Sequence, residues 1–348
     1  MIYPILAIFL GGLSLLRRNI LFLFTISLIC TFSISLFDLP DNDAYQYIYE
    51  SLPALSSEVV LGNSDTFNTL YGELGYKLLN SFSKNIGLSY YSFRFFLLFF
   101  IVFSKLYLFK LIIKDNTQYL LCAISYFSLF FYIDSYVLRQ SIASVFICYS
   151  LYLAYNKSYL FSFFLFFIAP FFHVSAIFCS PLLFIIRKEF SRGFYLSLFV
   201  GIFIVGIVGV KSIVLNLVNY IPSSYLVSKL LRYSVNEYGE ALGVVRISVI
   251  LYSSFFILCV FRLRTEYRAL LLNAFLISLL FLIGFNDFGI LGERGFRLAS
   301  TFIPVAMSSV VFLFARKDKY FNAAILWLFF IIVGTAFSVG YETNYMGF

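Results

Sequence analysis

Arginine residues at the ends of apolar runs are the side chains of this sequence best suited to chemistry. Arg139 opens one such run in the segment Asp134-Ser-Tyr-Val-Leu-Arg139-Gln140, and Arg294 and Arg297 directly precede another. A guanidinium group suits bidentate binding of a phosphate or a carboxylate. Because residues three apart lie on one face of a helix, Arg294 and Arg297 could together hold one diphosphate.

Each of these arginines also has a purely structural interpretation. Asp134 and Arg139 could form an ion pair at a turn, with no ligand involved. Residues 292–297, the densest charge cluster on the predicted outer side of the membrane, could be an anchor at a membrane interface with an internal ion pair. Glu293 in this cluster could otherwise orient the arginines or act as a base.

His173 is the only histidine in the sequence, and it lies between two apolar runs in the segment Phe172-His173-Val-Ser175-Ala176. A histidine in this place could act as a general base or donate a hydrogen bond to a phosphate. It could equally be a structural residue, hydrogen-bonded to Ser175 or to a backbone carbonyl. The sequence leaves both interpretations open.

Acidic residues and tyrosines alternate after the second apolar run, in the segment Asp41-Asn-Asp43-Ala-Tyr45-Gln-Tyr47. Tyrosine rings and carboxylates suit a carbohydrate, through packing and through hydrogen bonds to its hydroxyl groups. With a single histidine and five cysteines that all fall inside apolar runs, the sequence has no metal-ligand spacing. We therefore expect neither a metal nor a cofactor.

The elements that position these residues follow from the composition. Hydrophobic residues make up 61% of the 348 residues, and charged residues only 12%. Soluble domains carry about 25% charged residues, and their cores stop growing at about 250–300 residues. This excludes a soluble enzyme, a nucleic-acid-binding domain and a disordered chain. We expect an all-α, polytopic integral membrane protein whose single transmembrane domain covers residues 1–348.

Short polar stretches divide the chain into about twelve apolar runs, and a membrane-spanning helix needs about 20 residues. The runs are 2–16, 20–37, 93–113, 119–134, 137–155, 159–172, 174–187, 194–215, 245–261, 269–285, 298–315 and 320–338. The first lacks a basic start and a cleavage site, so we expect a span and not a removable signal peptide. The runs within 119–134 and 159–187 are short and could be tilted or re-entrant.

Lysines and arginines separate the loops into two sides. Loops on one side carry fourteen basic and four acidic residues, whereas acids outnumber bases on the other side. The positive-inside rule assigns the first side to the cytoplasm. Twelve spans then place both termini on the outer side, together with two long connections over about 38–92 and 216–244. Because long connections are usually functional, we expect the working surface to face outward.

Four short segments with polar or aromatic residues occur one after another along the chain. They are residues 41–47, Glu73-Leu-Gly75-Tyr76, Leu138-Arg139-Gln140-Ser-Ile-Ala143 and Phe172-His173-Val-Ser175-Ala176. Together they resemble the EpsG/Wzy-type polysaccharide polymerases of bacteria, over about residues 38–180. The remainder agrees in topology and in its Arg294 and Arg297 pair. Arg232 and Gly243, with ten residues between them, also fit an Arg-x10-Gly element of some such polymerases.

The resemblance implies a metal-independent membrane glycosyltransferase, an O-antigen or exopolysaccharide polymerase of lipopolysaccharide biosynthesis in the bacterial inner membrane. Its donor would be a growing glycan on undecaprenyl diphosphate. Its acceptor would be a hydroxyl of a new undecaprenyl-diphosphate-linked oligosaccharide at the periplasmic face. The implied partners are the lipid bilayer and a chain-length regulator protein, and no nucleic acid.

The resemblance and the residue chemistry together give two sets of candidate residues. The candidate catalytic residues are His173, Arg139, Glu293 and Asp43. The candidate substrate-binding residues are Arg294, Arg297, Arg232, Arg94, Tyr45 and Tyr47. In this hypothesis the arginines at 139, 294 and 297 bind the leaving diphosphate. His173, Asp43 or Glu293 then deprotonates the acceptor hydroxyl.

Three other functions compete with this one. A flippase or transporter of lipid-linked oligosaccharides would show internal symmetry and mid-span charges, whereas the charges here cluster at outer ends and no repeat is evident. An O-antigen ligase-like glycosyltransferase would share the lipid-linked donor, and only the order of the motifs argues against it. A membrane acyltransferase would need a cytosolic acyl donor, and the cytoplasmic loops are only a few residues long.

Overall fold

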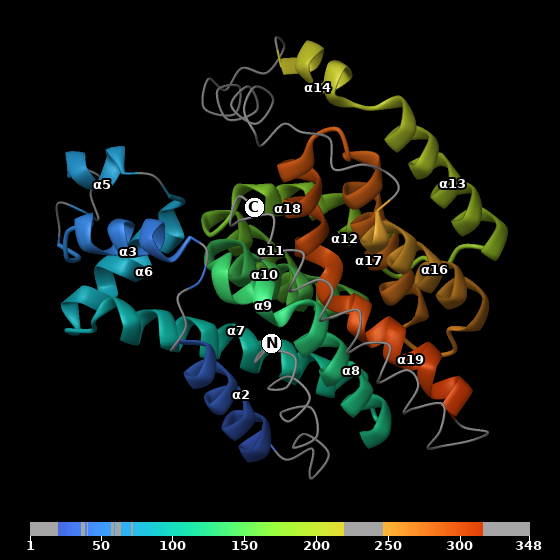
Figure 1. Cartoon of the computed structure of the whole chain (residues 1–348), viewed down its shortest axis with the longest axis horizontal. Helices are drawn as coiled ribbons and strands as arrows, with labels where there is room; N and C mark the ends of the chain where they lie inside the picture. The colour runs from blue at the N-terminus through green and yellow to red at the C-terminus, as the bar shows by residue number, and fades with distance from the viewer. Residues whose placement is uncertain are drawn as a thin grey trace.

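The computed structural model of the chain describes residues 20–315, except residues 36–38, 40, 57–58, 60–63, 71 and 219–245. Every regular element in these residues is a helix (Figure 1). The predicted all-α fold is confirmed. The apolar runs 2–16 and 320–338 lie outside the described residues, as does Arg232 with nearly all of the second long connection.

Four of the predicted runs correspond to single helices, whereas six contain a break. The single helices are α2 (Ile20–Ser35), α7 (Tyr90–Ile112), α10 (Leu138–Tyr155) and α16 (Ile247–Arg262). The broken runs form α8 (Asn116–Leu129) with α9 (Phe131–Tyr136), α11 (Tyr159–Ile168) with the 3-10 helix η1 (Ala169–Phe171), and η2 (Val174–Cys179) with α12 (Ser180–Ile185). They also form α13 (Arg192–Val208) with α14 (Lys211–Val218), α17 (Arg268–Leu279) with the π-helix η4 (Leu280–Gly284), and α18 (Gly289–Ala299) with η5 (Ser300–Phe302) and α19 (Ile303–Ala315).

Proline and glycine account for three of these breaks. Pro170 and Pro181 stand in the first turns of η1 and α12, where the missing proline N–H leaves no helical hydrogen bond unmade. Gly209 separates α13 from α14 with a φ of 82°, a conformation that favours glycine. The runs 159–172 and 174–187 are therefore shorter as helices than their apolar sequence suggests.

Two helices in the described part of the chain are long and apolar enough to cross a membrane, Tyr90–Ile112 and Leu291–Phe312. The second joins α18, η5 and α19. The other apolar helices in the described part run for 10–17 residues, below the length of about 20 residues that spans a bilayer without help. These lengths do not confirm about twelve spans, and that number stays a prediction.

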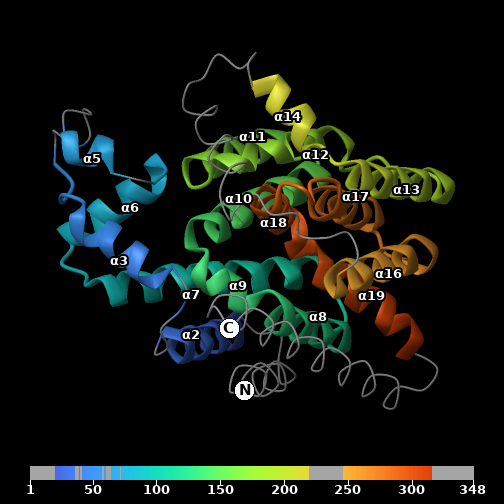
Figure 2. The same ribbon diagram turned by 45° about the horizontal axis from the view of Figure 1, so that its top comes forward.

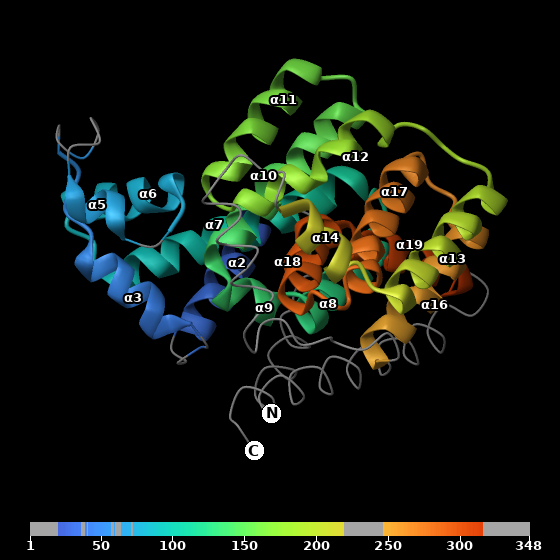
Figure 3. The same cartoon turned by 90° about the horizontal axis from the view of Figure 1, so that it is seen from above.

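The first long connection is folded into helices. It contains α3 (Asn42–Ser51), α5 (Asp65–Thr69) and α6 (Leu74–Asn85). All three views show these helices gathered at one end of α7, beside the larger body of the remaining helices (Figures 1, 2 and 3). We call them the α3–α6 layer. Tyr49 of α3 stacks on Phe93 of α7 with ring centroids 5.4 Å apart, which fixes this layer on α7.

Helix α10 lies at the centre of the body, where it packs against α7, α11, α18 and both 3-10 helices of residues 169–179. Helix α18 in turn packs closely on the π-helix η4. A Cβ atom on Gly295 would lie 2.1 Å from the Phe281 ring, so only glycine permits this approach. The close packing brings the charged residues of α18 to the start of α10.

Candidate active site

The guanidinium group of Arg139 lies between an acid and an aromatic ring at the start of α10. Its Nη1 donates a hydrogen bond to Oε2 of Glu73 at 2.6 Å, and its Cζ lies 5.8 Å from the centroid of the Tyr45 ring. The Arg139 and Glu73 side chains are only 11% and 8% exposed. Little water therefore screens this ion pair, and each buried charge is stabilised mainly by its contact with the other.

Three of the four segments singled out in the sequence meet at this point. Tyr45 comes from α3, Glu73 directly precedes α6, and Arg139 is the second residue of α10. The Tyr45 ring also packs edge-on against Tyr76, with centroids 5.6 Å apart. We call Tyr45, Glu73 and Arg139 the Arg139 cluster.

Tyr45 remains a neutral phenol in this cluster. Burial raises the pKa of its hydroxyl, and the nearby Arg139 guanidinium offsets only part of that rise. A neutral phenol keeps its proton and can donate a hydrogen bond to an incoming oxygen. Asp43 and Tyr47, the other candidates from the same helix, are exposed on its opposite face.

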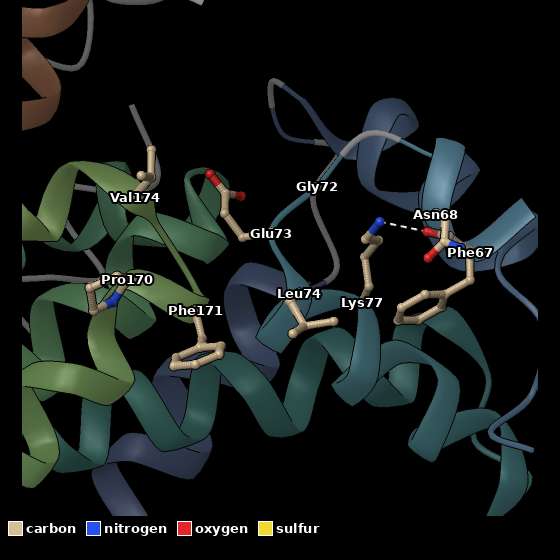
Figure 4. Close-up of a pocket in the computed structure, with 9 residues that line it drawn as sticks. All are labelled: Phe67, Asn68, Gly72, Glu73, Leu74, Lys77, Pro170, Phe171 and Val174. Carbon is tan, nitrogen blue, oxygen red and sulfur yellow. Dashed lines mark hydrogen bonds between the residues drawn. The ribbon is translucent and has the colours of Figure 1, made fainter. Parts of the chain in front are cut away.

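The fourth segment adjoins the cluster through α6. A Cβ atom on Gly75 would lie 2.8 Å from the backbone oxygen of Phe171, so glycine is needed where α6 meets η1. A cavity of about 440 Å³ opens beside this contact, lined by Glu73, Val174 and seven further residues (Figure 4). The chain between Pro170 and Val174 therefore forms one wall of a space whose other wall carries Glu73.

His173 precedes η2 and is only 6% exposed. Its Nδ1 lies 2.5 Å from the hydroxyl oxygen of Ser175, which is the hydrogen bond that the structural interpretation of this residue predicts. The bond fixes the orientation of the imidazole. Because η2 packs against both α10 and α18, His173 stands next to the elements that carry the candidate arginines.

A second group of charges lies on α18, and we call it the α18 cluster. Glu293 Oε2 is 3.4 Å from Arg297 Nη2, and Glu293 Oε1 is 3.8 Å from Arg246 Nη1. Arg297 Nη2 also lies 3.4 Å from the hydroxyl oxygen of Tyr136, just before α10. The internal ion pair that the sequence suggested for residues 292–297 is therefore present, and it contacts the start of α10.

Helix α18 is also joined to α10 through its backbone. The side-chain amide of Gln140 donates a hydrogen bond to the backbone oxygen of Arg294. The Arg294 side chain is half-buried on the same helix. Arg139 on α10 therefore adjoins the helix that carries Arg294 and Arg297, a proximity that residue spacing in the sequence indicated only for the last two.

Arg94 belongs to α7 and contacts α3. Its Nη1 donates a hydrogen bond to Oδ1 of Asn42 at 2.8 Å, and the Tyr90 hydroxyl donates to the same oxygen at 2.9 Å. Arg94 is only 2% exposed. In this structure the residue holds the α3–α6 layer on α7, and through that layer it supports the position of Tyr45.

Asp134 has a different partner from the one that the structural interpretation considered. Lys105 of α7 donates to both of its carboxylate oxygens, at 2.8 and 2.7 Å. The hydroxyls of Tyr126 and Ser141 donate to the same carboxylate at 2.8 and 2.9 Å. The alternative of an Asp134–Arg139 pair is therefore wrong: the aspartate stabilises a buried lysine, and the arginine pairs with Glu73.

Sequence reasoning did not place Glu73, Lys105 or Asp134 among the candidate site residues. Glu73 was visible only as part of a short motif. Lys105 did carry a signal, because an ionisable residue inside an apolar run is costly without a partner.

Within the described residues, no three His, Cys, Asp or Glu side chains gather closely enough to hold a metal ion.

Comparison with known proteins relates the chain to a protein family. The model of the EpsG family matches residues 19–346, nearly the whole chain and all of the described residues. No curated protein and no solved structure matches the chain. The match extends far beyond the four short segments, which lie between residues 41 and 176.

Proposed function

Because the chain belongs to the EpsG family, we propose that it is a polytopic membrane enzyme that polymerises lipid-linked oligosaccharide repeat units at the periplasmic face of the bacterial inner membrane. Family membership suggests a polysaccharide polymerase-type function and a lipid-linked saccharide substrate, and the family is membrane-associated. The donor is a growing glycan on undecaprenyl diphosphate, and a chain-length regulator assists the enzyme.

The observation that carries this proposal is the Arg139 cluster. Glu73 and Tyr45, which precede Arg139 by 66 and 94 residues on the chain, both contact its guanidinium at the start of a central helix, so tertiary packing fixes the position of this one cation. A buried guanidinium with a fixed orientation suits a diphosphate, because its planar fork matches two phosphate oxygens. Arg297 and Arg294, on the adjoining helix, supply further positive charge.

In the proposed step, the acceptor hydroxyl oxygen attacks the anomeric carbon of the donor sugar. The bond between that carbon and the diphosphate oxygen breaks, and the diphosphate leaves with the bonding electron pair. Arg139, Arg294 and Arg297 stabilise the charge that develops on the leaving group, a role that a metal ion fills in other enzymes. The hydroxyl proton passes to a base, for which His173, Glu293 and Asp43 are the candidates.

A strain that lacks the gene tests the function directly. We expect its surface polysaccharide, separated on a gel, to carry a single repeat unit in place of long chains. A strain with no repeat units at all would instead indicate a flippase or a ligase. Full-length chains would contradict a role of this protein in polymerisation.

Replacing His173 by glutamine tests the choice of base. Glutamine can keep a hydrogen bond to Ser175 but cannot accept a proton near neutral pH. If His173 is the base, the polymerisation rate should fall about 100-fold or more, while the amount of protein in the membrane stays unchanged. Ser175→Ala, which removes the hydrogen bond but not the imidazole, should cost much less. A fully active His173→Gln variant would leave Glu293 and Asp43 as the candidates.

A further inference from the structure

The cavity between the α3–α6 layer and η1 is not explained by binding of a diphosphate. Its lining residues are Phe67, Asn68, Gly72, Glu73, Leu74, Lys77, Pro170, Phe171 and Val174. Its volume of about 440 Å³ falls in the range of about 300–1,000 Å³ that is usual for ligand sites. Figure 4 shows these side chains around the space, with contributions from both walls.

The cations near this cavity do not make it an anion site. Lys77 is the only basic residue among the described residues of the lining, and it donates hydrogen bonds to the backbone oxygens of Phe67 and Leu70 at 2.5 and 3.1 Å. Its Nζ also lies 4.9 Å from the centroid of the Phe67 ring. Burial lowers the pKa of this lysine. Glu73 balances the charge of Lys77, so the lining carries no net positive charge to attract a phosphate.

The uncharged part of the lining suits a sugar. Phe171 is 51% exposed and Leu74 46%, so both present apolar surface on which the C–H face of a sugar ring can pack. Asn68 is exposed and can both donate and accept a hydrogen bond. The Glu73 carboxylate can accept hydrogen bonds from hydroxyl groups. Ligand sites of this size usually have mostly apolar walls and a few polar groups that fix the orientation of the ligand.

The position of Glu73 relates the cavity to the Arg139 cluster. Glu73 lines the cavity, and its carboxylate holds the Arg139 guanidinium at 2.6 Å. A donor sugar is joined directly to its diphosphate, and so it would lie at the arginine itself. Arg139 is not among the lining residues of the cavity, so a sugar bound in the cavity is one that carries no phosphate.

We propose that this cavity binds the terminal sugar of the acceptor repeat unit, with Phe171 as the packing surface and Asn68 and Glu73 as its hydrogen-bonding groups. This assignment rests on the proposed function, because the acceptor repeat unit is a substrate of the proposed polymerisation step. It makes Phe171 and Asn68 determinants of acceptor binding. Glu73 then joins the acceptor hydroxyls to the arginine that holds the leaving group.

The test uses the full-length protein, purified in detergent. The probe is the oligosaccharide released by mild acid from the lipid-linked repeat units of the gene-deletion strain, so that it carries no diphosphate and no lipid. Its affinity is measured by saturation-transfer NMR titration. We expect Phe171→Ala and Asn68→Ala each to weaken binding about tenfold or more. Phe167→Ala, an exposed ring of α11 outside the lining, is the matched control and should bind the probe as the unmodified protein does.

A kinetic measurement separates this proposal from the proposed function. With lipid-linked repeat units as substrate, Phe171→Ala and Asn68→Ala should raise the KM for chain extension about tenfold and leave kcat nearly unchanged. Equal probe affinity in all variants, or no binding by the unmodified protein, would overturn the acceptor site while the deletion phenotype still supported a polymerase. Full-length polysaccharide in the deletion strain would instead overturn the proposed function.

Discussion

Replacing Arg139 by alanine is expected to abolish long-chain polysaccharide. The guanidinium lies at the meeting point of three segments, where Glu73 and Tyr45 fix its position. Removing one fixed donor to a developing negative charge typically costs about 100–1,000-fold in rate. Gel analysis of the polysaccharide and an in vitro extension assay measure the effect. Arg139→Lys should recover little activity, because an ammonium group lacks the planar fork.

Arg139→Ala also leaves Glu73 buried without its partner. Breaking a buried ion pair lowers the free energy of unfolding by about 3–5 kcal/mol, so this variant could lose activity through loss of stability alone. A double variant, Glu73→Gln with Arg139→Met, removes both charges at similar volume and should fold as well as the unmodified protein. It should nevertheless make no long chains. Arg268→Ala serves as the control for loss of a paired arginine: Arg268 pairs with Glu189, which is 58% exposed. Normal chain length in any stable Arg139 variant would refute its role.

The position of Arg139 could be predicted from the sequence, whereas its partner could not. The apolar run after it predicts a helix that starts near residue 137, and the structure begins α10 at Leu138. Glu73 lies 66 residues away along the chain, and nothing local relates the two. The pairing follows from the packing of α6 against η1, which a single glycine at position 75 permits. Tertiary contacts of this kind have no periodic signal in the sequence.

The same distinction holds for the fold. Apolar composition predicts an all-α chain, and the helices confirm it. The breaks within the runs depend on local features that composition hides. Pro170 and Gly209 each interrupt the helix within an apolar run that has no break in its hydrophobic pattern. The tyrosine-rich connection forms helices because Tyr45 and Tyr49 of α3 share one buried face, a helical period that alternating acids and tyrosines obscure.

Removing either charge of the Lys105–Asp134 pair is expected to destabilise the protein strongly. The Lys105 and Asp134 side chains are 3% and 11% exposed, and the carboxylate accepts hydrogen bonds from three donor residues. Lys105→Met leaves a buried carboxylate without its cation, and Asp134→Asn leaves a buried ammonium without its anion. Each should lower the free energy of unfolding by about 3–5 kcal/mol. Thermal unfolding of the purified variants in detergent measures the loss.

An exposed pair provides the matched control for this prediction. Lys114 and Glu266 are 2.8 Å apart but 80% and 55% exposed, so Lys114→Met should cost less than about 1 kcal/mol. The double variant Lys105→Met with Asp134→Asn removes both buried charges and should recover most of the stability that either single variant loses. Strictly additive losses would contradict the pairing. The result bears on the site as well, because Asp134 also accepts a hydrogen bond from Ser141. That bond ties the first turn of α10, and with it Arg139, to the buried pair.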